Sequence, residues 1–399
     1  MGLSSCMHDH ARHRDESRGR PDRGKACPRL CKGAGRSRGK ADAHRLIGWI
    51  VGFWLVASGV AADTFRVATY HADLSRKGPG LLLRDILKGN DQSEAVAEVI
   101  ARVRPDILLL LDIDFDFEAR ALGALNARIA AAGHRFDHAF TKRPNSGMAT
   151  DLDLDGDGRR GGPGDAQGFG RFAGEGGMAV LSRWPIGEVT DLSGLIWGAQ
   201  PWAIYPEVGG RPYPSDEAKA VQRLSSVAHW VLPVETPEGR VTLAAFHATP
   251  SVFDGPEDRN GRRNHDEIML WRHWMNGDFG QATEGRFIIL GDANLDPVDG
   301  DGIKVAIRGL LGDARLQDPL PKSPGAPAEA DPEHEGNPAL DTVDWPGPDP
   351  GNLRVDYVLP SADFRLRGAG VFWPAPGEDG HDLAQRASRH RLVWVDLEF

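Results

Sequence analysis

The most constraining feature of this sequence is a series of short apolar runs, most of which lead directly into or out of His, Asp or Asn. Continuous apolar runs of this length are typical of buried β-strands. They span residues 65–70, 106–113, 177–182, 241–247, 286–292, 354–360 and 391–397. Between them, the spacing of apolar residues predicts helices over 91–104 and 264–276. This alternation predicts a layered α/β domain with largely buried sheets.

The polar residues at the strand ends form a candidate site. They are His71, Asp73, Asp112, His247, Asp292, Asn294, Asp356 and His390. Strand ends in α/β sheets meet along one rim, where ligands usually bind. Burying such groups without partners would cost several kcal/mol each. The preference of Asp and Asn for turns explains any single one of them, but not the whole set. We therefore expect them to converge on each other, on a metal or on solvent.

Four motifs carry a family resemblance. They are FHATP (246–250), GDANLDP (291–297), RVDYVLPS (354–361) and SRHRLVWVDL (388–397). Together they resemble the endonuclease/exonuclease/phosphatase superfamily, to which deoxyribonuclease I belongs, with order and spacing that fit throughout residues 65–399. The stretch 253–268 resembles a bacterial secreted branch of it. The resemblance implies an α/β fold over residues 63–399, a four-layer αββα sandwich with two mixed β-sheets.

The resemblance also implies site roles. The implied catalytic residues are His71, His247, Asp292, Asn294, Asp356 and His390. Asp73, Asp112 and Asp292 would bind Mg²⁺ or Mn²⁺, and Asn294 would contact the substrate. Hard carboxylate oxygens suit such a cation, and imidazole titrates near neutral pH, which suits a histidine pair to acid and base roles. The implied reaction is metal-dependent hydrolysis of a phosphodiester or phosphomonoester, with a nuclease among the alternatives.

Three positions depart from the family pattern. His71 stands where the family has Asn, Asp112 where it has Glu, and Arg389 where it has Asp. Asp112 is one methylene shorter, and Mg²⁺ demands near-ideal geometry. Arg389 either clamps the substrate phosphate or lowers the pKa of His390 and removes an orienting acceptor. The alternative to an active enzyme is therefore a catalytically degenerate member that binds a phosphorylated ligand or calcium.

A second metal site is suggested by an acidic loop. Its alternating carboxylates are Asp151, Asp153, Asp155 and Asp157. This spacing directs carboxylates at one ion, but Gly162 occupies the twelfth position in place of the glutamate of an EF-hand. The two interpretations are a calcium or structural metal site outside the EF-hand class, with Asp165 as a further ligand, and a solvated acidic loop.

One glutamate and one cluster of arginines each have two interpretations. Glu175 either orients His247 or lies on the surface. Arg259, Arg262 and Arg263 form a basic cluster that either grips a phosphate or pairs with acidic residues nearby, and the second interpretation is favoured.

The N-terminal 62 residues are predicted to be a targeting segment and not part of the domain. Residues 46–62 form an apolar run closing with small residues, as in a secretory signal, and the 45 residues before them are basic and predicted to be disordered. The segment acts either as a signal peptide, cleaved near Ala62, or as a signal anchor. We therefore expect a secreted or periplasmic protein. All three cysteines precede residue 32, so the domain uses no disulfide.

The distribution of charge along the chain limits the class of substrate that we expect. Residues 1–45 hold 12 Lys/Arg and 5 Asp/Glu, a balance of +7, so the net charge of −10 leaves about −17 for the rest. An acidic body disfavours a long polyanion, because nucleic-acid binding rests on Lys and Arg. The implied partner is a phosphoester substrate, with DNA, RNA, a phospholipid head group and a small phosphate ester as alternatives. No stable protein partner is implied, and membrane contact is implied only if the signal stays uncleaved.

Overall fold

The computed structural model describes residues 64–280, 285–347 and 349–399. The predicted basic segment and signal, residues 1–62, lie outside the described residues. Within the described ranges, no helix combines the length and the apolar character needed to cross a membrane.

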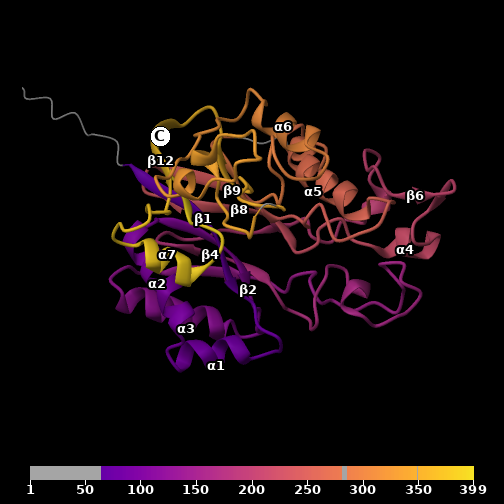
Figure 1. The fold of residues 1–399 in the computed structure, drawn as a ribbon, viewed down its shortest axis with the longest axis horizontal. Helices are drawn as coiled ribbons and strands as arrows, with labels where there is room; N and C mark the ends of the chain where they lie inside the picture. The colour runs from indigo at the N-terminus through magenta and orange to yellow at the C-terminus, as the bar shows by residue number, and fades with distance from the viewer. Residues whose placement is uncertain (1–63, 281–284, 348) are drawn as a thin grey trace, which may run out of the picture. The chain divides into compact units, whose positions relative to one another are not determined.

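Two mixed β-sheets form the centre of the domain (Figure 1). In order across the first sheet, the strands are β12 (Arg365–Val371), β13 (Val393–Glu398), β1 (Phe65–Leu74), β2 (Ile107–Ile113), β4 (Gly177–Ser182) and β3 (His138–Thr141). Across the second sheet they are β11 (Asp356–Pro360), β10 (Phe287–Asp292), β9 (Gly239–His247), β8 (Ala228–Thr236) and β5 (Thr190–Asp191). The β1–β2 and β9–β10 pairs are parallel and the other pairs antiparallel. A separate ribbon pairs β6 (Glu207–Val208) with β7 (Arg211–Pro212).

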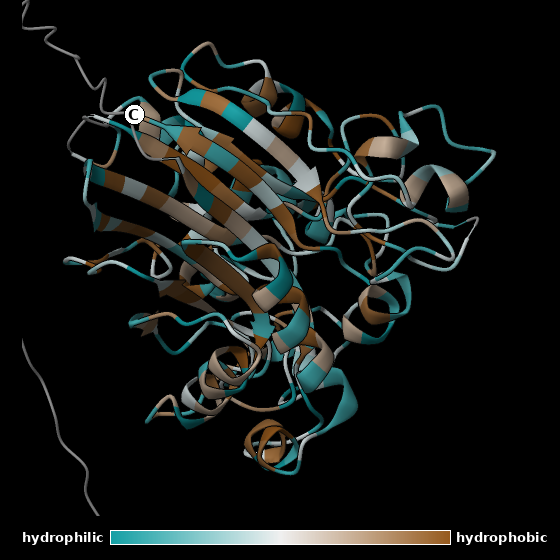
Figure 2. Ribbon diagram, turned by 90° about the vertical axis from the view of Figure 1, so that its left-hand side faces the viewer, coloured by the Kyte–Doolittle hydropathy of each residue, from teal (hydrophilic) through white to brown (hydrophobic). Residues whose placement is uncertain are grey.

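Alternation along the strands builds three apolar layers. In β1, Val67 packs into the core between the two sheets, whereas Ala68 packs against the helices on the outer face. Those helices are α1 (Leu81–Leu87), α2 (Asp91–Val103), α3 (Arg120–Ala131) and α7 (His381–Ala387). The outer face of the second sheet packs against α5 (Arg259–Met275) and α6 (Val305–Leu311). Figure 2 shows apolar residues concentrated on the central strands. The predicted four-layer αββα sandwich is confirmed.

The strands and α2 lie close to their predicted positions. The side chain of Asn90 caps α2 by accepting from the backbone N–H groups of Gln92 and Ser93, and the helix ends at Val103, before Pro105. β1 is four residues longer than predicted and carries His71 and Asp73 within it. The strand therefore delivers both side chains on a paired backbone.

The predicted start of one helix was wrong. Helix α5 begins at Arg259, five residues before the predicted start, because its first turns are polar and apolar periodicity does not reveal them. The irregular stretch between α6 and β11 contains two short 3₁₀ turns, Ala326–Glu329 and Pro338–Leu340. Thr342 and Val343 in this stretch are fully buried, because they pack beside the strand ends described below.

Candidate active site

Three neighbouring strands of the second sheet place His247, Asp292 and Asp356 in one row. Asp292 in β10 is the register partner of both His247 in β9 and Asp356 in β11. Because paired residues on adjacent strands lie within a few ångströms, this register fixes the three side chains at one edge of the sheet.

The first sheet supplies its residues through irregular backbone. The β1–β2 register shifts between His71 and Leu74, and the β2–β4 register shifts between Leu111 and Ile113. Asp73 and Asp112 lie at these shifts with φ of 49° and 54°. Bulges reorient side chains near functional sites, and a positive φ is uncommon outside glycine, although Asp and Asn tolerate it best.

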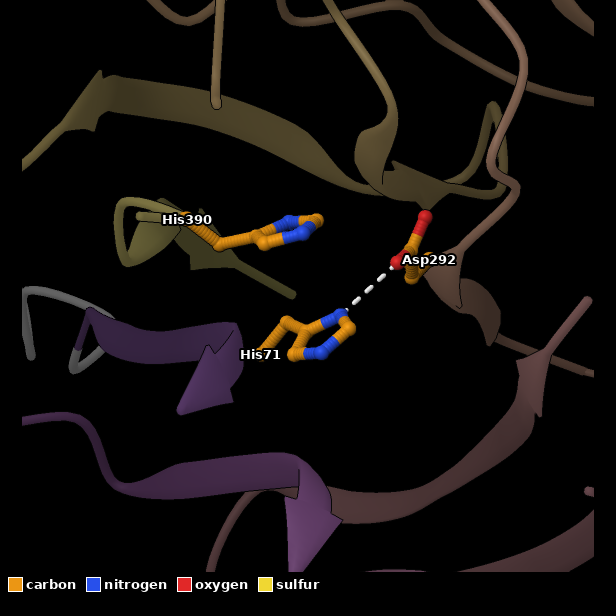
Figure 3. Close-up of side chains that lie close together, drawn as sticks. All are labelled: His71, Asp292 and His390. Atoms are coloured by element: carbon orange, nitrogen blue, oxygen red, sulfur yellow. Dashed lines mark hydrogen bonds and ion pairs between the residues drawn. The ribbon is translucent and has the colours of Figure 1, made fainter. Parts of the chain in front are cut away.

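His71 lies at the centre of the candidate site (Figure 3). Its Nδ1 lies 2.9 Å from Asp292 Oδ2, and its Nε2 lies 3.8 Å from both Asp73 Oδ1 and Asp112 Oδ2. Burial lowers the pKa of His71, but hydrogen bonds and charges from Asp112 and Asp292 outweigh it and raise the pKa well above its ordinary value. The imidazole thus joins carboxylates from both sheets.

His390 stacks on His71 and is held from behind by Asp356. Figure 3 shows the two rings stacked face to face, and their centroids lie 3.9 Å apart at an interplanar angle of 18°. His390 Nδ1 lies 2.9 Å from Asp356 Oδ2, to which Thr342 Oγ1 also donates at 2.9 Å. His390 therefore keeps an orienting acceptor, Asp356, although Arg389 stands where the family has Asp. An ionised Asp356 fixes the proton of His390 on Nδ1.

His247 completes the histidine set. Its Nε2 lies 3.6 Å from Asp292 Oδ2, and within the described chain its buried Nδ1 has no hydrogen-bond partner. Burial lowers the pKa of His247 to about 4, aided by the charges of His71 and His390 and opposed by those of Asp292 and Asp112. This imidazole is neutral at physiological pH.

Asp292 and Asn294 are fixed by backbone contacts. Asp292 is fully buried, and its Oδ1 accepts from the backbone N–H of Asn294 at 2.7 Å. Burial raises the pKa of Asp292, but the hydrogen bond from His71 and the charge of His390 lower it overall. Asn294 adopts φ of 47°, and its Nδ2 donates to the carbonyl of Ala248 at 2.9 Å.

Arg389 contacts Asp73. Its backbone N–H donates to Asp73 Oδ2 at 3.0 Å and its Nη2 to Oδ1 at 3.3 Å, while Ser388 Oγ donates to Oδ2 at 3.1 Å. Burial raises the pKa of Asp73, but the charges of His71 and His390 and the hydrogen bonds from Arg389 lower it overall. The side chain of Arg389 is 61% exposed, so its pairing with Asp73 is a contact at the rim.

At this edge of the two sheets, two groups of described side chains have the composition of a metal site. His71, Asp73 and Asp112 offer ligand atoms within 4.8 Å of one another, and so do His71, Asp292 and His390. The predicted set of Asp73, Asp112 and Asp292 is therefore divided, because the ring of His71 lies between Asp292 and the other two. The carboxylates of Asp73 and Asp112 are hard oxygen donors that fit Mg²⁺ or Mn²⁺.

Glu175 takes neither of its two predicted places. It is buried, and its carboxylate accepts from the backbone N–H of Arg171 at 2.5 Å and lies 3.4 Å from the guanidinium of Arg171. Its neighbour Gly176 approaches Asp112 so closely that an added Cβ would lie 2.9 Å from Asp112 Oδ1. Glu175 thus helps fold the loop behind Asp112 and does not contact His247.

The basic cluster also differs from both interpretations. Arg263 is buried, and its guanidinium donates to the carbonyl groups of Leu224, Gln167, Arg223 and Ser225. Arg262 donates to the carbonyl of Ile204 at 3.4 Å. These arginines hold loop backbone, which is the role that polar residues at the start of α5 share.

The acidic loop gathers only some of its carboxylates. Asp153, Asp155 and Asp165 have oxygens within 4.8 Å of one another, while Asp151 and Asp157 do not join this group. Backbone N–H groups already donate to both oxygens of Asp153 and of Asp165. The carboxylates of Asp153 and Asp165 thus stabilise the loop by accepting from its backbone N–H groups. Asp165, the predicted further ligand, is buried.

A pocket of about 430 Å³ opens beside the histidines. It is lined by His71, His247, Pro250, Val252, Phe253, Asn294, Trp345, Pro346, Asp349, Pro350, Arg389 and His390. Phe253 and Trp345 are pocket residues that the sequence alone does not reveal. Both lie in loops without apolar periodicity, and although Phe253 opens the stretch 253–268, that resemblance assigns it no place in a pocket.

Two mixed sheets between helical layers, with histidines and carboxylates of both sheets gathered at one edge, define the class of αββα sandwiches. The chain belongs to the endonuclease/exonuclease/phosphatase family, whose model matches residues 72–390. That range begins just after His71 and ends at His390, so it includes every residue of the candidate site except His71.

Solved structures are similar at low identity. An endonuclease/exonuclease/phosphatase from Beutenbergia cavernae is 16% identical over 84% of this chain and 72% of its own, with a TM-score of 0.49. A family protein from Leptotrichia buccalis is 15% identical over 84% and 100%, with a TM-score of 0.47. Sphingomyelinase C from Streptomyces griseocarneus is 16% identical over 84% and 99%, with a TM-score of 0.43. No curated protein sequence matches the chain.

Proposed function

We propose that this protein hydrolyses phosphoester bonds with the aid of a divalent cation, Mg²⁺ or Mn²⁺. The observation that carries the proposal is the convergence of His71, His247 and His390 with Asp73, Asp112 and Asp292 beside one pocket. Membership of the endonuclease/exonuclease/phosphatase family supports it, because all three named activities cleave phosphoester bonds.

The cation would be held by Asp73 and Asp112, with His71 and Asp292 adjacent. Bound there, it would neutralise negative charge on the phosphate oxygens. Asn294 lines the pocket with one N–H of its side-chain amide bound to Ala248, so the second N–H is available to donate to a phosphate oxygen.

The two outer histidines divide the proton transfers. His390 is oriented through Nδ1 by Asp356, which stabilises the imidazolium, so Nε2 is placed to donate a proton to the leaving oxygen. His247 lines the pocket as a neutral imidazole, because burial lowers its pKa, and we assign it the acceptance of a proton from water.

The test is hydrolysis of a chromogenic phosphodiester and phosphomonoester by the purified protein with EDTA, Mg²⁺, Mn²⁺ or Ca²⁺. We expect cation-dependent turnover that falls at least about 100-fold in Asp292→Ala, His247→Ala and His390→Ala, the usual scale for losing a catalytic acid or base. Asp379→Ala, at a carboxylate that is 92% exposed, is the matched control and should retain turnover. Full activity of Asp292→Ala would refute the proposed site.

A second candidate is a degenerate member that binds a phosphorylated ligand without cleaving it. The contact of Arg389 with Asp73 favours it, because the guanidinium already neutralises a carboxylate that a cation needs. Under this alternative, Arg389→Asp should raise turnover from near zero by about tenfold or more. An active wild type that loses rate in Arg389→Asp would exclude it.

Export stays a prediction from residues 46–62. N-terminal sequencing of protein recovered outside the cytoplasm tests it, and a first residue near Asp63 is expected for a cleaved signal.

A further inference from the structure

The pocket beside the histidines has a chemical character that the family does not specify. Among its lining residues, Pro250, Val252, Phe253, Trp345, Pro346 and Pro350 are apolar. They lie on two loops, one following β9 and one preceding β11. The side chains that carry the chemistry thus open onto a partly open, largely apolar pocket of about 430 Å³, within the range of roughly 300–1,000 Å³ for small-molecule sites.

Phe253 is held in the pocket wall by its backbone. It is 87% exposed and adopts φ of 70°, a conformation that is a genuine outlier for a bulky residue. Asn260 holds the two residues that flank Phe253. The Nδ2 of Asn260 donates to the carbonyl of Val252 at 2.8 Å, and its backbone N–H donates to Asp254 Oδ2 at 2.5 Å. An exposed aromatic on a strained, clamped backbone points to a contact with a ligand.

Trp345 forms another wall, next to the chemistry. Its ring meets His390 edge-on, with centroids 5.5 Å apart at 87°. The backbone beside it is fixed, because the N–H of Asp344 donates to the carbonyl of Arg389 at 3.0 Å and the carboxylate of Asp344 accepts from Arg391 at 2.9 Å. The indole is therefore presented at a defined distance from His390.

The charges of the pocket suit a single phosphate group. Arg389 is the one Lys or Arg among the lining residues, and its guanidinium contacts Asp73. A nucleic-acid strand needs several cations along its path, because each phosphate must be neutralised. The lining offers no such row.

We propose that this pocket binds the organic group of a small phosphoester and that this group is an aromatic ring placed against Phe253 and Trp345. The inference rests on the proposed phosphoesterase function. Aromatic walls favour a flat ring over an aliphatic group of equal size by roughly three- to tenfold in affinity for each ring contact.

Calorimetry tests the inference separately from turnover. Phenylphosphonate, cyclohexylphosphonate and methylphosphonate are titrated into the protein with Mg²⁺. We expect phenylphosphonate to bind at least tenfold tighter than methylphosphonate and at least threefold tighter than cyclohexylphosphonate. Equal affinity of the phenyl and cyclohexyl compounds would overturn the aromatic preference.

Variants locate the effect. Phe253→Ala and Trp345→Leu should each weaken phenylphosphonate at least threefold and leave methylphosphonate unchanged, whereas the control Phe117→Ala, at a phenylalanine 95% exposed outside this pocket, should change neither. Unchanged affinities in both pocket variants would overturn the assignment of the ring to this pocket. A duplex oligonucleotide that binds more tightly than phenylphosphonate would overturn the small-ester class. Ligand binding without turnover under any cation would instead refute the proposed hydrolysis alone.

Discussion

At the scale of single residues, His71 is one of the three positions at which the chain departs from the pattern it resembles, which has asparagine at that point. Its ring lies within 3.8 Å of carboxylate oxygens of Asp73 and Asp112 and within 2.9 Å of Asp292. An imidazolium there offsets the mutual repulsion of three carboxylates, so it occupies an electrostatic position that a divalent cation would otherwise take.

This arrangement predicts that His71→Asn strengthens cation binding. Removing the competing imidazole should lower the Kd for Mg²⁺ and Mn²⁺ by about tenfold, since one unit charge among carboxylates is worth more than about 1.4 kcal/mol. Calorimetric titration of the metal alone measures it. The control is His138→Asn in the edge strand β3. A Kd that rises in His71→Asn would instead make His71 a ligand of the metal.

At the scale of elements, the polar start of α5 organises two site loops. The Nδ2 of Asn264 donates to the carbonyl groups of Thr249 and Ala293, both at 2.7 Å. Thr249 follows β9 and Ala293 follows β10, so one side chain ties the loop after His247 to the loop after Asp292. Glu267 reinforces the tie by accepting from the backbone N–H of Thr249 at 2.7 Å.

Asn264 is therefore predicted to be a positioning residue. Asn264→Ala should lower the free energy of unfolding by about 1–3 kcal/mol, because it leaves two carbonyl groups without their donor. It should also lower kcat by about tenfold or more with little change in KM, since small displacements of catalytic groups are costly. Urea unfolding and steady-state kinetics measure the two effects.

Asn126→Ala is the matched control for Asn264. Its Nδ2 also donates to a carbonyl, that of Phe136, at 2.9 Å on the outer helical layer. This variant should lose stability and keep kcat. Equal losses of kcat in the two variants would show that Asn264 acts through stability alone.

At the scale of the whole domain, the site exists only because two sheets pack face to face. The first sheet carries His71, Asp73 and Asp112, and the second carries His247 and Asp292. The core between the sheets sets the distance between the two sets, and close-packed cores transmit small changes in volume.

Truncation of that core should therefore be costly. Leu243→Ala, at a fully buried residue of β9 in this core, should lower the free energy of unfolding by about 2–5 kcal/mol through lost burial and the cavity left behind. Leu87→Ala, at a leucine that is 63% exposed, should change it by less than about 0.5 kcal/mol. Urea denaturation followed by circular dichroism compares them, and similar values for the two variants would contradict this account of the core.

The sequence alone determined the order of the motifs along the chain, the layered fold and most residues of the candidate site. Local information is sufficient there, because apolar runs mark buried strands and the motif residues lie at their ends. The same local signals identified His390 and Asp356 without showing that they meet. They also missed the first five residues of α5 and the aromatic pocket residues Phe253 and Trp345.

The tertiary structure decided which side chains contact each other. His71 and Asp292 are 221 positions apart, and their 2.9 Å contact depends on the packing of two sheets and on a bulge in β1. Arg389 was predicted to face either the phosphate or His390, and it contacts Asp73, while Glu175 contacts Arg171. Side-chain partners are set by backbone positions accurate to an ångström, and those positions arise from long-range packing, which sequence spacing does not encode.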